Sequence, residues 1–88
     1  MSSLEEVENK RKRLIFRSEH RGTKEMDLIL GSFAKKYVYG FSEDELALYD
    51  DILNESDPDL YNWISGIEDF PANKANSVYE KLLKHKFA

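Results

Sequence analysis

Cysteine is absent from this sequence of 88 residues, and glycine and proline are scarce, with four and two copies. Without cysteine the chain has no disulfide framework, no thiolate nucleophile and none of the cysteine-rich zinc sites. Its glycines form neither a GxGxxG turn nor a P-loop, so nucleotide binding through a glycine-rich loop has no support. Stability must therefore come from side-chain packing, and a hydrophobic content of 41% allows one modest core.

No stretch of the sequence approaches the roughly 20 consecutive apolar residues that a membrane span requires. The first residues, Met1 to Glu6, lack the basic and apolar regions of a signal peptide and are too acidic for a transit peptide. We therefore expect a soluble protein without membrane insertion. Its expected location is the bacterial cytoplasm, or the mitochondrial matrix if the chain is a eukaryotic one that has already been processed.

Charge is distributed unevenly along the chain, whose formal net charge is −4. Such polarity is typical of a basic face that meets a partner, but solvated helix faces produce the same pattern. The net negative charge opposes nucleic acid and anionic membranes, so we expect neither as a partner. Basic residues crowd the first third and acidic residues the middle: Lys10, Arg11, Lys12, Arg13, Arg17, Arg21 and Lys24, then Glu43, Asp44, Glu45, Asp50, Asp51, Glu55, Asp57 and Asp59.

The residues needed for catalysis are not recognisable in the sequence. A catalytic site would require a nucleophile beside a base, paired carboxylates in a cleft, or a metal cluster. His20 and His85 lie far apart and lack an HExxH spacing, so we interpret both as surface imidazoles rather than zinc ligands. A helix-turn-helix interpretation lacks a recognition helix rich in Arg, Asn and Gln. The sequence therefore predicts a protein that is not an enzyme.

The first predicted helix spans about 4–19 and begins with a capping box formed by Ser3 and Glu6. Its apolar stripe is interrupted at Lys10 and Arg11, so the helix should be partly buried with its basic side chains in water. The apolar positions near helical spacing are Leu4, Val7, Leu14 and Ile15.

The second predicted helix follows Gly22 and has the widest apolar face, which places it at the centre of the fold. It should end near Tyr39, with Gly40 in the left-handed conformation that closes many helices. The apolar positions are Met26, Ile29, Leu30, Phe33, Ala34 and Tyr37.

The third predicted helix spans about 43–54 and starts with a capping box formed by Ser42 and Glu45. Phe41 and Leu46 occupy the two positions of a hydrophobic staple around this start. The inward stripe consists of Leu46, Tyr49, Ile52 and Leu53.

The fourth predicted helix spans about 58–65, with Asp57 as its cap, Pro58 at its first position and Gly66 as its stop. A fifth helix should span about 75–86. The fourth helix should bury Leu60, Trp63 and Ile64. The fifth helix is indicated by the apolar positions Ala75, Val78, Tyr79, Leu82 and Leu83.

The predicted fold is all-α, a small five-helix bundle that forms a single domain over residues 1–88. The sequence shows no strand-like alternation and no internal repeat. Short turns between helices favour antiparallel neighbours. Four aromatic residues lie on the apolar stripes and are interpreted as core residues rather than flavin-stacking ones: Phe33, Tyr37, Tyr49 and Trp63.

The segment Arg21-Gly22-Thr23-Lys24-Glu25 stands out at the junction of the first two predicted helices. Arg21 and Glu25 are four residues apart, so both lie on one face if the helix begins early enough to include Arg21. Gly22 between them removes a side chain and allows another backbone or a flat ligand to approach closely. From the residues alone, an ordinary ion pair worth about a few tenths of a kcal/mol is the favoured interpretation of this spacing.

Arg21-Gly22-x-x-Glu25, followed by Asp27, resembles the RGxxE signature of the succinate dehydrogenase assembly factor family, also called flavinators of that enzyme. The motif alone is weak, but further segments resemble family sequence in the same order, which makes the likeness specific. The resemblance covers roughly residues 11–66, and the C-terminal stretch beyond them matches less well. The further segments are Leu30 to Lys36, Leu48 to Leu53 and Asp57 to Trp63.

The resemblance implies a factor that binds the flavoprotein subunit of succinate dehydrogenase or of fumarate reductase. We expect the free factor to be monomeric, and the sequence leaves open whether it dimerises. It implies that the factor promotes covalent attachment of FAD to a histidine of that subunit without carrying out a chemical step itself. FAD is then the cofactor of the partner, and the factor holds none stably. By family analogy Arg21, Gly22 and Glu25 form a surface patch near the partner's flavin site, and Asp27 supports it.

On this basis we expect Arg21 and Glu25 to act as a charged pair that orders partner residues, while Gly22 lets the two surfaces meet closely. Three residues near the motif widen the expected interface: Arg13, Arg17 and His20. The alternative is a small helical adaptor or a free-flavin carrier unrelated to flavinylation. A flavin carrier would be isolated as a yellow, stoichiometric complex, whereas an assembly factor would be colourless.

Overall fold

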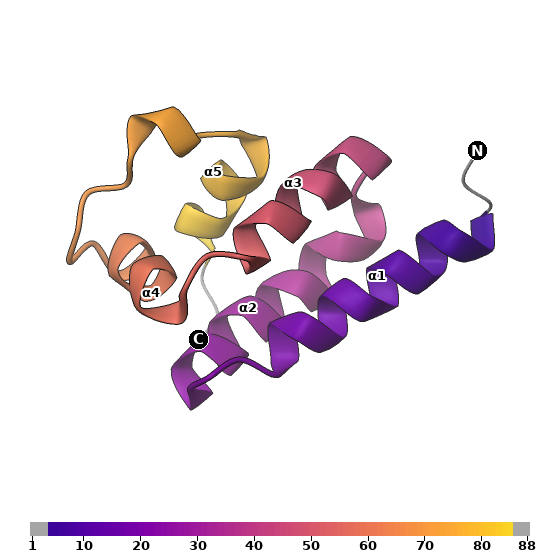
Figure 1. Cartoon of the computed structure of the whole chain (residues 1–88), viewed down its shortest axis with the longest axis horizontal. Helices are drawn as coiled ribbons and strands as arrows, with labels where there is room; N and C mark the ends of the chain where they lie inside the picture. Colours follow the sequence, from indigo (N-terminus) through magenta and orange to yellow (C-terminus); the bar gives the residue numbers. More distant parts are fainter. Residues whose placement is uncertain (1–3, 86–88) are drawn as a thin grey trace.

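Helices account for nearly all regular structure in residues 4–85, the part of the chain that the computed structural model describes (Figure 1). No β-strand occurs in this part, which confirms the predicted all-α fold with five helices. The elements are α1 (Leu4–Glu19), α2 (Lys24–Tyr37), the 3-10 turn η1 (Val38–Gly40), α3 (Glu43–Leu53), α4 (Asp57–Ser65), the 3-10 turn η2 (Ala72–Lys74) and α5 (Ser77–Lys84).

The helices pack as two neighbouring groups. α1 and α2 lie side by side and antiparallel, and α3 packs on α1 (Figure 1). α5 contacts both α3 and α4, so it joins the second half of the chain to the first. The described residues measure 40 × 28 × 20 Å along their principal axes. None of these helices is both long and apolar enough to cross a membrane.

The core is organised around Phe33 of α2, whose side chain is fully buried. Its ring lies 4.9 Å from that of Tyr37, 5.5 Å from that of Tyr49 on α3, and 6.2 Å from that of Phe41, measured between centroids. The His85 ring approaches it edge-on at 5.5 Å. α2 buries Met26, Ile29, Leu30, Phe33 and Ala34, as its wide apolar face predicts. Of the four stripe aromatics, Phe33, Tyr49 and Trp63 are core residues as predicted, and Tyr37 is partly buried against the core.

A second aromatic cluster lies between α4 and α5. The Trp63 ring meets Phe70 at 5.4 Å and Tyr79 at 6.3 Å, and the last two rings are 4.6 Å apart. Phe70 belongs to the loop that joins the two helices. Since offset and edge-to-face ring pairs stabilise beyond their buried area, this cluster holds an otherwise irregular loop against the bundle.

The helix caps follow the sequence in some places and depart from it in others. The capping box of Ser42 and Glu45 is present, with both of its hydrogen bonds formed. Gly66 ends α4 at φ 81, in the left-handed region, as expected of a stop signal. The predicted cap of α4 is wrong, because Ser56 rather than Asp57 accepts the hydrogen bond, from the backbone N–H of Asp59.

Gly40 does not adopt the predicted left-handed conformation, because the chain tightens into the 3-10 turn η1 instead. Arg11 of α1 supplies the reason. Its Nη1 donates to the carbonyl oxygens of Val38 at 2.6 Å and Phe41 at 2.7 Å, so these carbonyls are satisfied from outside the helix. The expectation that Arg11 stands in water is therefore wrong, and its side chain is only 13% exposed.

The ends of the chain also differ from expectation. α1 begins at Leu4 as predicted, but that side chain is exposed rather than part of a buried stripe. α5 begins at Ser77, two residues later than predicted, since the Asn76 side chain caps it by accepting from two backbone N–H groups at 2.9 Å. The predicted capping role of Ser3 and the predicted helix end at Lys86 lie outside the described residues.

Candidate functional site

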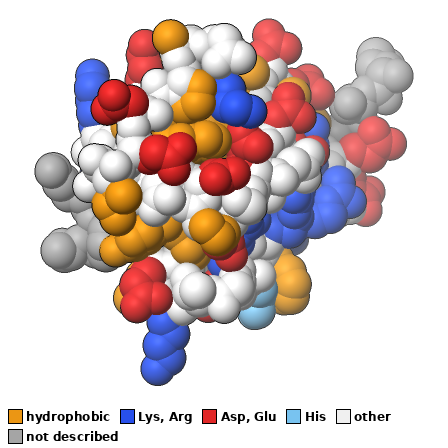
Figure 2. Space-filling view, turned by 60° about the vertical axis from the view of Figure 1, so that its left-hand side comes forward, with side chains coloured by type: hydrophobic (Ala, Val, Ile, Leu, Met, Phe, Trp, Pro, Cys, Tyr) orange, Lys and Arg blue, Asp and Glu red, His pale blue; other side chains and the backbone are white. Residues whose placement is uncertain are grey.

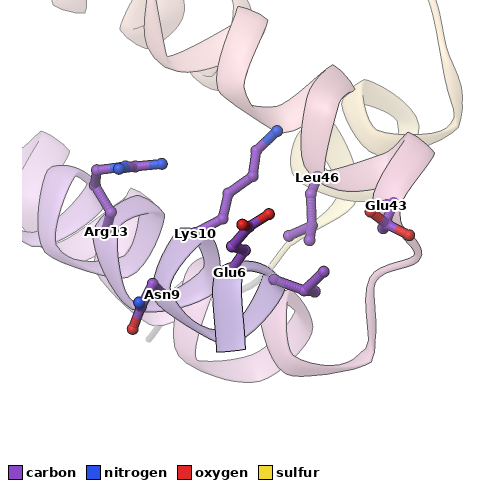
Figure 3. Close-up of a pocket in the computed structure, with 7 residues that line it drawn as sticks. Glu6, Asn9, Lys10, Arg13, Glu43 and Leu46 are labelled. Carbon is purple, nitrogen blue, oxygen red and sulfur yellow. The ribbon is translucent and has the colours of Figure 1, made fainter. Parts of the chain in front are cut away.

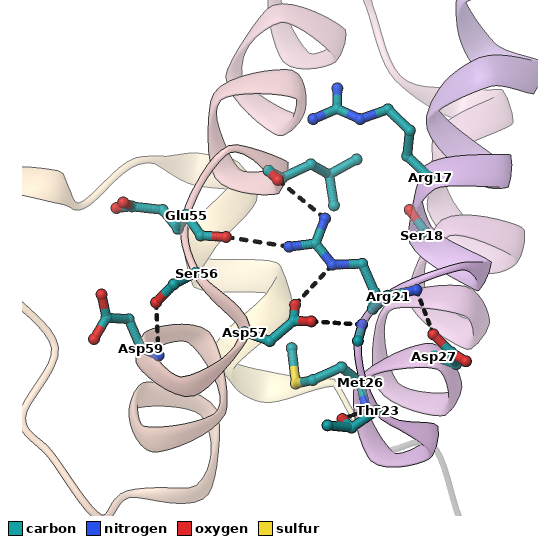
Figure 4. Close-up of polar contacts among 12 residues, drawn as sticks. Arg17, Ser18, Arg21, Thr23, Met26, Asp27, Glu55, Ser56, Asp57 and Asp59 are labelled. Atoms are coloured by element: carbon teal, nitrogen blue, oxygen red, sulfur yellow. Dashed lines mark hydrogen bonds and ion pairs between the residues drawn. The ribbon is translucent and has the colours of Figure 1, made fainter.

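Arg21 lies in the turn between α1 and α2 and directs its side chain into the protein (Figure 4). Its Nη1 donates to the carbonyl oxygen of Leu53 at 3.0 Å, and its Nη2 donates to that of Glu55 at 3.1 Å. Both acceptors lie where α3 ends, a position at which helix carbonyls lack partners and favour a cation. The side chain is only 11% exposed, so Arg21 braces the α3–α4 turn rather than facing solvent.

Asp57, at the start of α4, completes this brace. Its Oδ1 lies 2.8 Å from the Nε of Arg21, and its Oδ2 accepts from the backbone N–H of Gly22 at 2.7 Å. The carboxylate is 18% exposed and has both oxygens occupied. One side chain of α4 thus holds two consecutive residues of the α1–α2 turn (Figure 4).

Gly22 permits a close approach, but the approaching group belongs to the same chain. A Cβ atom at Gly22 would lie 3.0 Å from Oδ2 of Asp57, a contact tighter than nine in ten real Cβ contacts, so the carboxylate would have to shift. The position therefore favours glycine because the Asp57 carboxylate presses against the backbone. We expected a partner's backbone or a flat ligand to lie against Gly22. In the structure the group that lies against it is the Asp57 carboxylate of the same chain.

The start of α2 holds the turn from the other side. Asp27 in the first turn accepts a hydrogen bond from the backbone N–H of Arg21 through its Oδ1. Thr23 caps the helix, with its Oγ1 accepting from the backbone N–H of Met26 at 3.2 Å. A carboxylate in the first turn also matches the positive end of the helix dipole. The Asp27 side chain accordingly supports the geometry of the motif by holding the backbone of Arg21.

Glu25 does not pair with Arg21, so the expected charged pair is wrong. The cause is that Arg21 lies outside the helix and its guanidinium is committed to Leu53, Glu55 and Asp57. Glu25 itself is exposed on α2. Within residues 4–85 its carboxylate forms no hydrogen bond or ion pair. The motif therefore has two parts. Arg21 and Gly22 are held by Asp57, and the carboxylate of Glu25 is open to solvent.

An apolar hollow of about 360 Å³ adjoins the open carboxylate. Figure 2, which brings the α4 side of the molecule forward, shows hydrophobic side chains among acidic ones on this face. Leu28, which follows Glu25 by three residues on α2, adds another exposed apolar side chain on the same face. The hollow is lined by Thr23, Glu25, Met26, Asp57, Pro58 and Tyr61.

Two further predicted residues lie close to the motif. Arg17 pairs with Asp50 and donates to Oδ1 of Asn54 at 2.9 Å, which ties α1 to α3. His20 stacks on Phe16 with ring centroids 4.0 Å apart, and its Nδ1 lies 2.8 Å from the Phe16 carbonyl oxygen. Both His20 and Phe16 are exposed. They therefore form an aromatic edge next to the α1–α2 turn.

Arg13 is not brought to the motif. It lies on α1, about 9 Å of helix rise before that helix ends, and is exposed. It lines a separate hollow of about 460 Å³ between α1 and the start of α3, with Glu43 at the other end (Figure 3). The structure thus groups Arg21, Gly22 and Asp27 and places Arg13 elsewhere.

Asp57 and Tyr61 of α4 are the site residues that the sequence analysis missed. Asp57 had been assigned to helix capping, and the preceding Ser56 is an equally good cap by residue type. With Ser56 as the cap, the Asp57 carboxylate is free to bind another group, and this is the signal in the sequence that would have identified it. Tyr61 lies outside the predicted stripe of Leu60, Trp63 and Ile64, so only its place in the segment that resembles family sequence marked it.

The buried hydroxyls of Ser18 and Tyr49 satisfy each other beneath the site. The Ser18 hydroxyl donates to the carbonyl oxygen of Leu14 at 2.7 Å and lies 2.6 Å from the Tyr49 hydroxyl. Burial raises the pKa of Tyr49 to about 12, so the phenol stays neutral at physiological pH. This pair is therefore a structural link between α1 and α3.

His85 is half-buried rather than a surface imidazole, which corrects the prediction. Its Nε2 lies 2.9 Å from the Ser32 hydroxyl, and its ring packs on Phe33. Burial and the nearby charge of Lys36 lower the pKa of His85 below its ordinary value. Across residues 4–85 no group of three or more His, Cys, Asp or Glu side chains is arranged to hold a metal ion.

Taken together, these features define a small helical bundle that presents a braced turn and an open carboxylate at one end. The chain belongs to the family described as flavinator of succinate dehydrogenase, whose model matches residues 12–86. This match extends beyond residue 66, so the C-terminal stretch, which resembles family sequence less well, also lies within the family region.

Proteins named succinate dehydrogenase assembly factor 2, mitochondrial, are similar to the chain. That of Saccharomyces cerevisiae is 45% identical over 83 residues, covering 91% of this chain and 49% of its own. That of Debaryomyces hansenii is 42% identical over 83 residues, covering 91% and 58%. That of Drosophila grimshawi is 38% identical over 78 residues, covering 86% and 53%. The chain spans about half the length of these curated relatives.

Proposed function

We propose that this chain is an assembly factor that binds the flavoprotein subunit of succinate dehydrogenase and promotes covalent attachment of FAD to it. The observation that carries the proposal is the family match over residues 12–86, which contains the whole RGxxE segment. The chain acts as a binding protein and not as an enzyme. FAD belongs to the partner, and the factor retains none.

Within this function the residues of the motif have separate roles. Arg21 and Gly22 act as positioning residues, because Asp57 and the end of α3 occupy their polar groups. Asp27 helps to hold the same turn. Glu25 is the member of the motif that meets the partner, since it is exposed and unpaired within the described residues.

The neighbouring surface widens this interface. His20 stacks on Phe16 beside the motif, and both side chains are open to a partner. Arg17 contributes through its remaining exposed edge while it holds Asp50. Arg13 lies farther along α1 and belongs to the interface only if the partner also covers the hollow between α1 and α3.

Preorganisation is the physical contribution that such a factor can make. Attachment of FAD requires a partner histidine held against the C8 methyl of the flavin while negative charge develops on the ring system. Fixing that geometry removes an entropic cost from the reaction without any chemical step by the factor. We infer that the factor stabilises one domain arrangement of the flavoprotein. We also infer that the flavoprotein subunit of fumarate reductase is a second partner.

Partner capture followed by flavin detection tests the proposal. Tagged wild-type factor should capture the flavoprotein subunit from cells lacking endogenous factor, and the captured subunit should show in-gel flavin fluorescence. The Glu25→Gln variant should lower both signals. Glu80→Gln, which changes an exposed carboxylate on α5, is the matched control and should leave both unchanged.

Two results would contradict the proposal. One is equal covalent flavin in cells with and without the factor. The other is a purified factor that is yellow and holds FAD stoichiometrically, which would instead identify a free-flavin carrier. We expect the factor in the compartment of the flavoprotein, either the bacterial cytoplasm or the mitochondrial matrix, and a mitochondrial location agrees with the names of the relatives.

A further inference from the structure

The hollow beside Glu25 has mainly apolar walls. Met26 forms its buried base, and Pro58 and Tyr61 of α4 form one side. Tyr61 is 38% exposed, so part of this residue faces solvent. A space of about 360 Å³ between two helix starts is large enough for one long side chain of another protein.

Two carboxylates border this hollow, and only one of them is open. Both oxygens of Asp57 are occupied, by Nε of Arg21 and the backbone N–H of Gly22. Glu25 has no such partner within the described residues. Lys24 is its neighbour in sequence, but adjacent helix residues do not face each other. The hollow therefore keeps one uncompensated negative charge at its rim.

This combination selects among the side chains that a partner protein could insert. An aliphatic side chain would cover Glu25 and leave its charge desolvated and unpaired, which is costly. An acidic side chain would be repelled. A lysine would pair with Glu25 but is a strongly hydrated point charge. An arginine has an apolar stem, a planar fork that matches a carboxylate and a flat face that stacks on an aromatic ring.

We propose that the hollow receives an arginine side chain from the surface of the partner flavoprotein. Its guanidinium pairs with Glu25, its flat face lies on Tyr61, and its methylene groups lie along Pro58. The proposal rests on the proposed function and names the partner chemistry at the same site. It also explains why the motif needs a brace, because Arg21 and Asp57 fix the distance between α2 and α4 that sets the width of the hollow.

Binding of the flavoprotein subunit at several salt concentrations provides the first test. For Glu25→Gln we expect Kd to rise roughly tenfold at low salt and its salt dependence to become shallower, because an interface charge pair is lost. Tyr61→Leu should raise Kd about threefold by removing the ring face. Glu80→Gln should bind as wild type. If Glu25→Gln binds with the affinity and salt dependence of wild type, the proposal is overturned.

Chemical footprinting of the flavoprotein identifies the inserted residue. Phenylglyoxal, which modifies arginine, should react more slowly with one arginine of the subunit when wild-type factor is bound. That protection should disappear with Glu25→Gln at a concentration that restores the complex. Protection of a lysine against acetylation instead, with every arginine unchanged, would exclude an arginine as the occupant.

A small probe separates this inference from the proposed function, since it needs no flavoprotein. N-acetylarginine amide added to the factor should shift the NMR signals of the backbone amides of residues 23–26 and 61. The neutral isostere N-acetylcitrulline amide should not, and neither probe should shift them in Glu25→Gln. Equal shifts by both probes, or none by the first, overturn the inference. Failure of wild type to bind the flavoprotein contradicts the proposed function and the identity of the partner, whereas the probe still tests whether the hollow itself binds an arginine side chain.

Discussion

Arg21 and Asp57 are 36 residues apart in sequence and form an ion pair with 2.8 Å between Nε and Oδ1. The pair fastens the turn between α1 and α2 to the start of α4. It turns a motif arginine inward and leaves the motif glutamate, Glu25, facing solvent. The predictions below separate these two roles.

Replacing Asp57 with alanine should destabilise the fold. Loss of one partner leaves the guanidinium of Arg21 largely buried and short of an acceptor, so the free energy of unfolding should fall by about 2–3 kcal/mol. Urea denaturation followed by the fluorescence of Trp63 measures this change. Asp59→Ala, an exposed position on the same helix, is the control and should stay within about 0.5 kcal/mol of wild type. An equal effect of the two substitutions would argue against the brace.

Replacing Gly22 with alanine should cost about 1–2 kcal/mol, because the new Cβ would crowd Oδ2 of Asp57. The two positions should be coupled. In a background that already carries Asp57→Ala, the Gly22→Ala substitution should cost much less, and a double-mutant cycle measures the difference. Gly40→Ala is a suitable control, since a Cβ there meets no atom within 4 Å. Additive effects at Gly22 and Asp57 would show that the crowding is not with that carboxylate.

Function and stability should separate at Glu25. Glu25→Gln should lower covalent flavin in the partner subunit while the free energy of unfolding changes by less than about 0.5 kcal/mol, since the side chain is exposed and unpaired within the described residues. Asp57→Ala should lower both. Measuring flavin fluorescence and urea unfolding on the same preparations distinguishes the two kinds of variant. A Glu25→Gln protein as unstable as Asp57→Ala would contradict the division of the motif.

His85 should make stability depend on pH. Its pKa is lowered in the folded state by burial and by Lys36. In the unfolded chain the pKa of His85 is about 6.5, so below that pH the unfolded chain binds more protons than the folded chain. Stability should be fully present above about pH 6.5 and decline as pH falls through the window down to the folded pKa.

The measurement is the difference in unfolding free energy between wild type and His85→Gln from pH 7.5 to pH 5. Glutamine keeps a polar group near Ser32 but does not titrate. The wild-type curve should fall relative to the variant curve on acidification. Parallel curves, or an NMR titration of His85 with a midpoint above that of free histidine, would refute the assignment.

Local pattern was sufficient for the helices and their core. The stripe of α2 is set by residues three and four apart, and α2 does bury Met26 and Phe33. The capping box at Ser42 and the stop at Gly66 are likewise read from a few neighbouring residues. Such features depend on backbone hydrogen bonding within one turn, so no tertiary contact is needed to predict them.

The start of α4 shows where this approach is insufficient. Ser56 and Asp57 are both good caps by residue type, and the choice between them depends on a distant group. Because Arg21 and Gly22 approach the Asp57 carboxylate, Ser56 takes the capping hydrogen bond. The same reasoning applies to Gly40, whose left-handed conformation became unnecessary once Arg11 satisfied the neighbouring carbonyls.

The sequence by itself determined that this chain forms five amphipathic helices and carries the RGxxE segment of its family. Only the tertiary structure decided what that segment does with its charges. Arg21 and Glu25 are close in sequence, and local spacing alone would pair them. The packing of α4 against the turn gives Arg21 one carboxylate and two carbonyl oxygens at the end of α3, all partly shielded from water. An ion pair with the solvent-exposed Glu25 would stabilise the fold less than these contacts do. Glu25 was thereby left open beside the hollow.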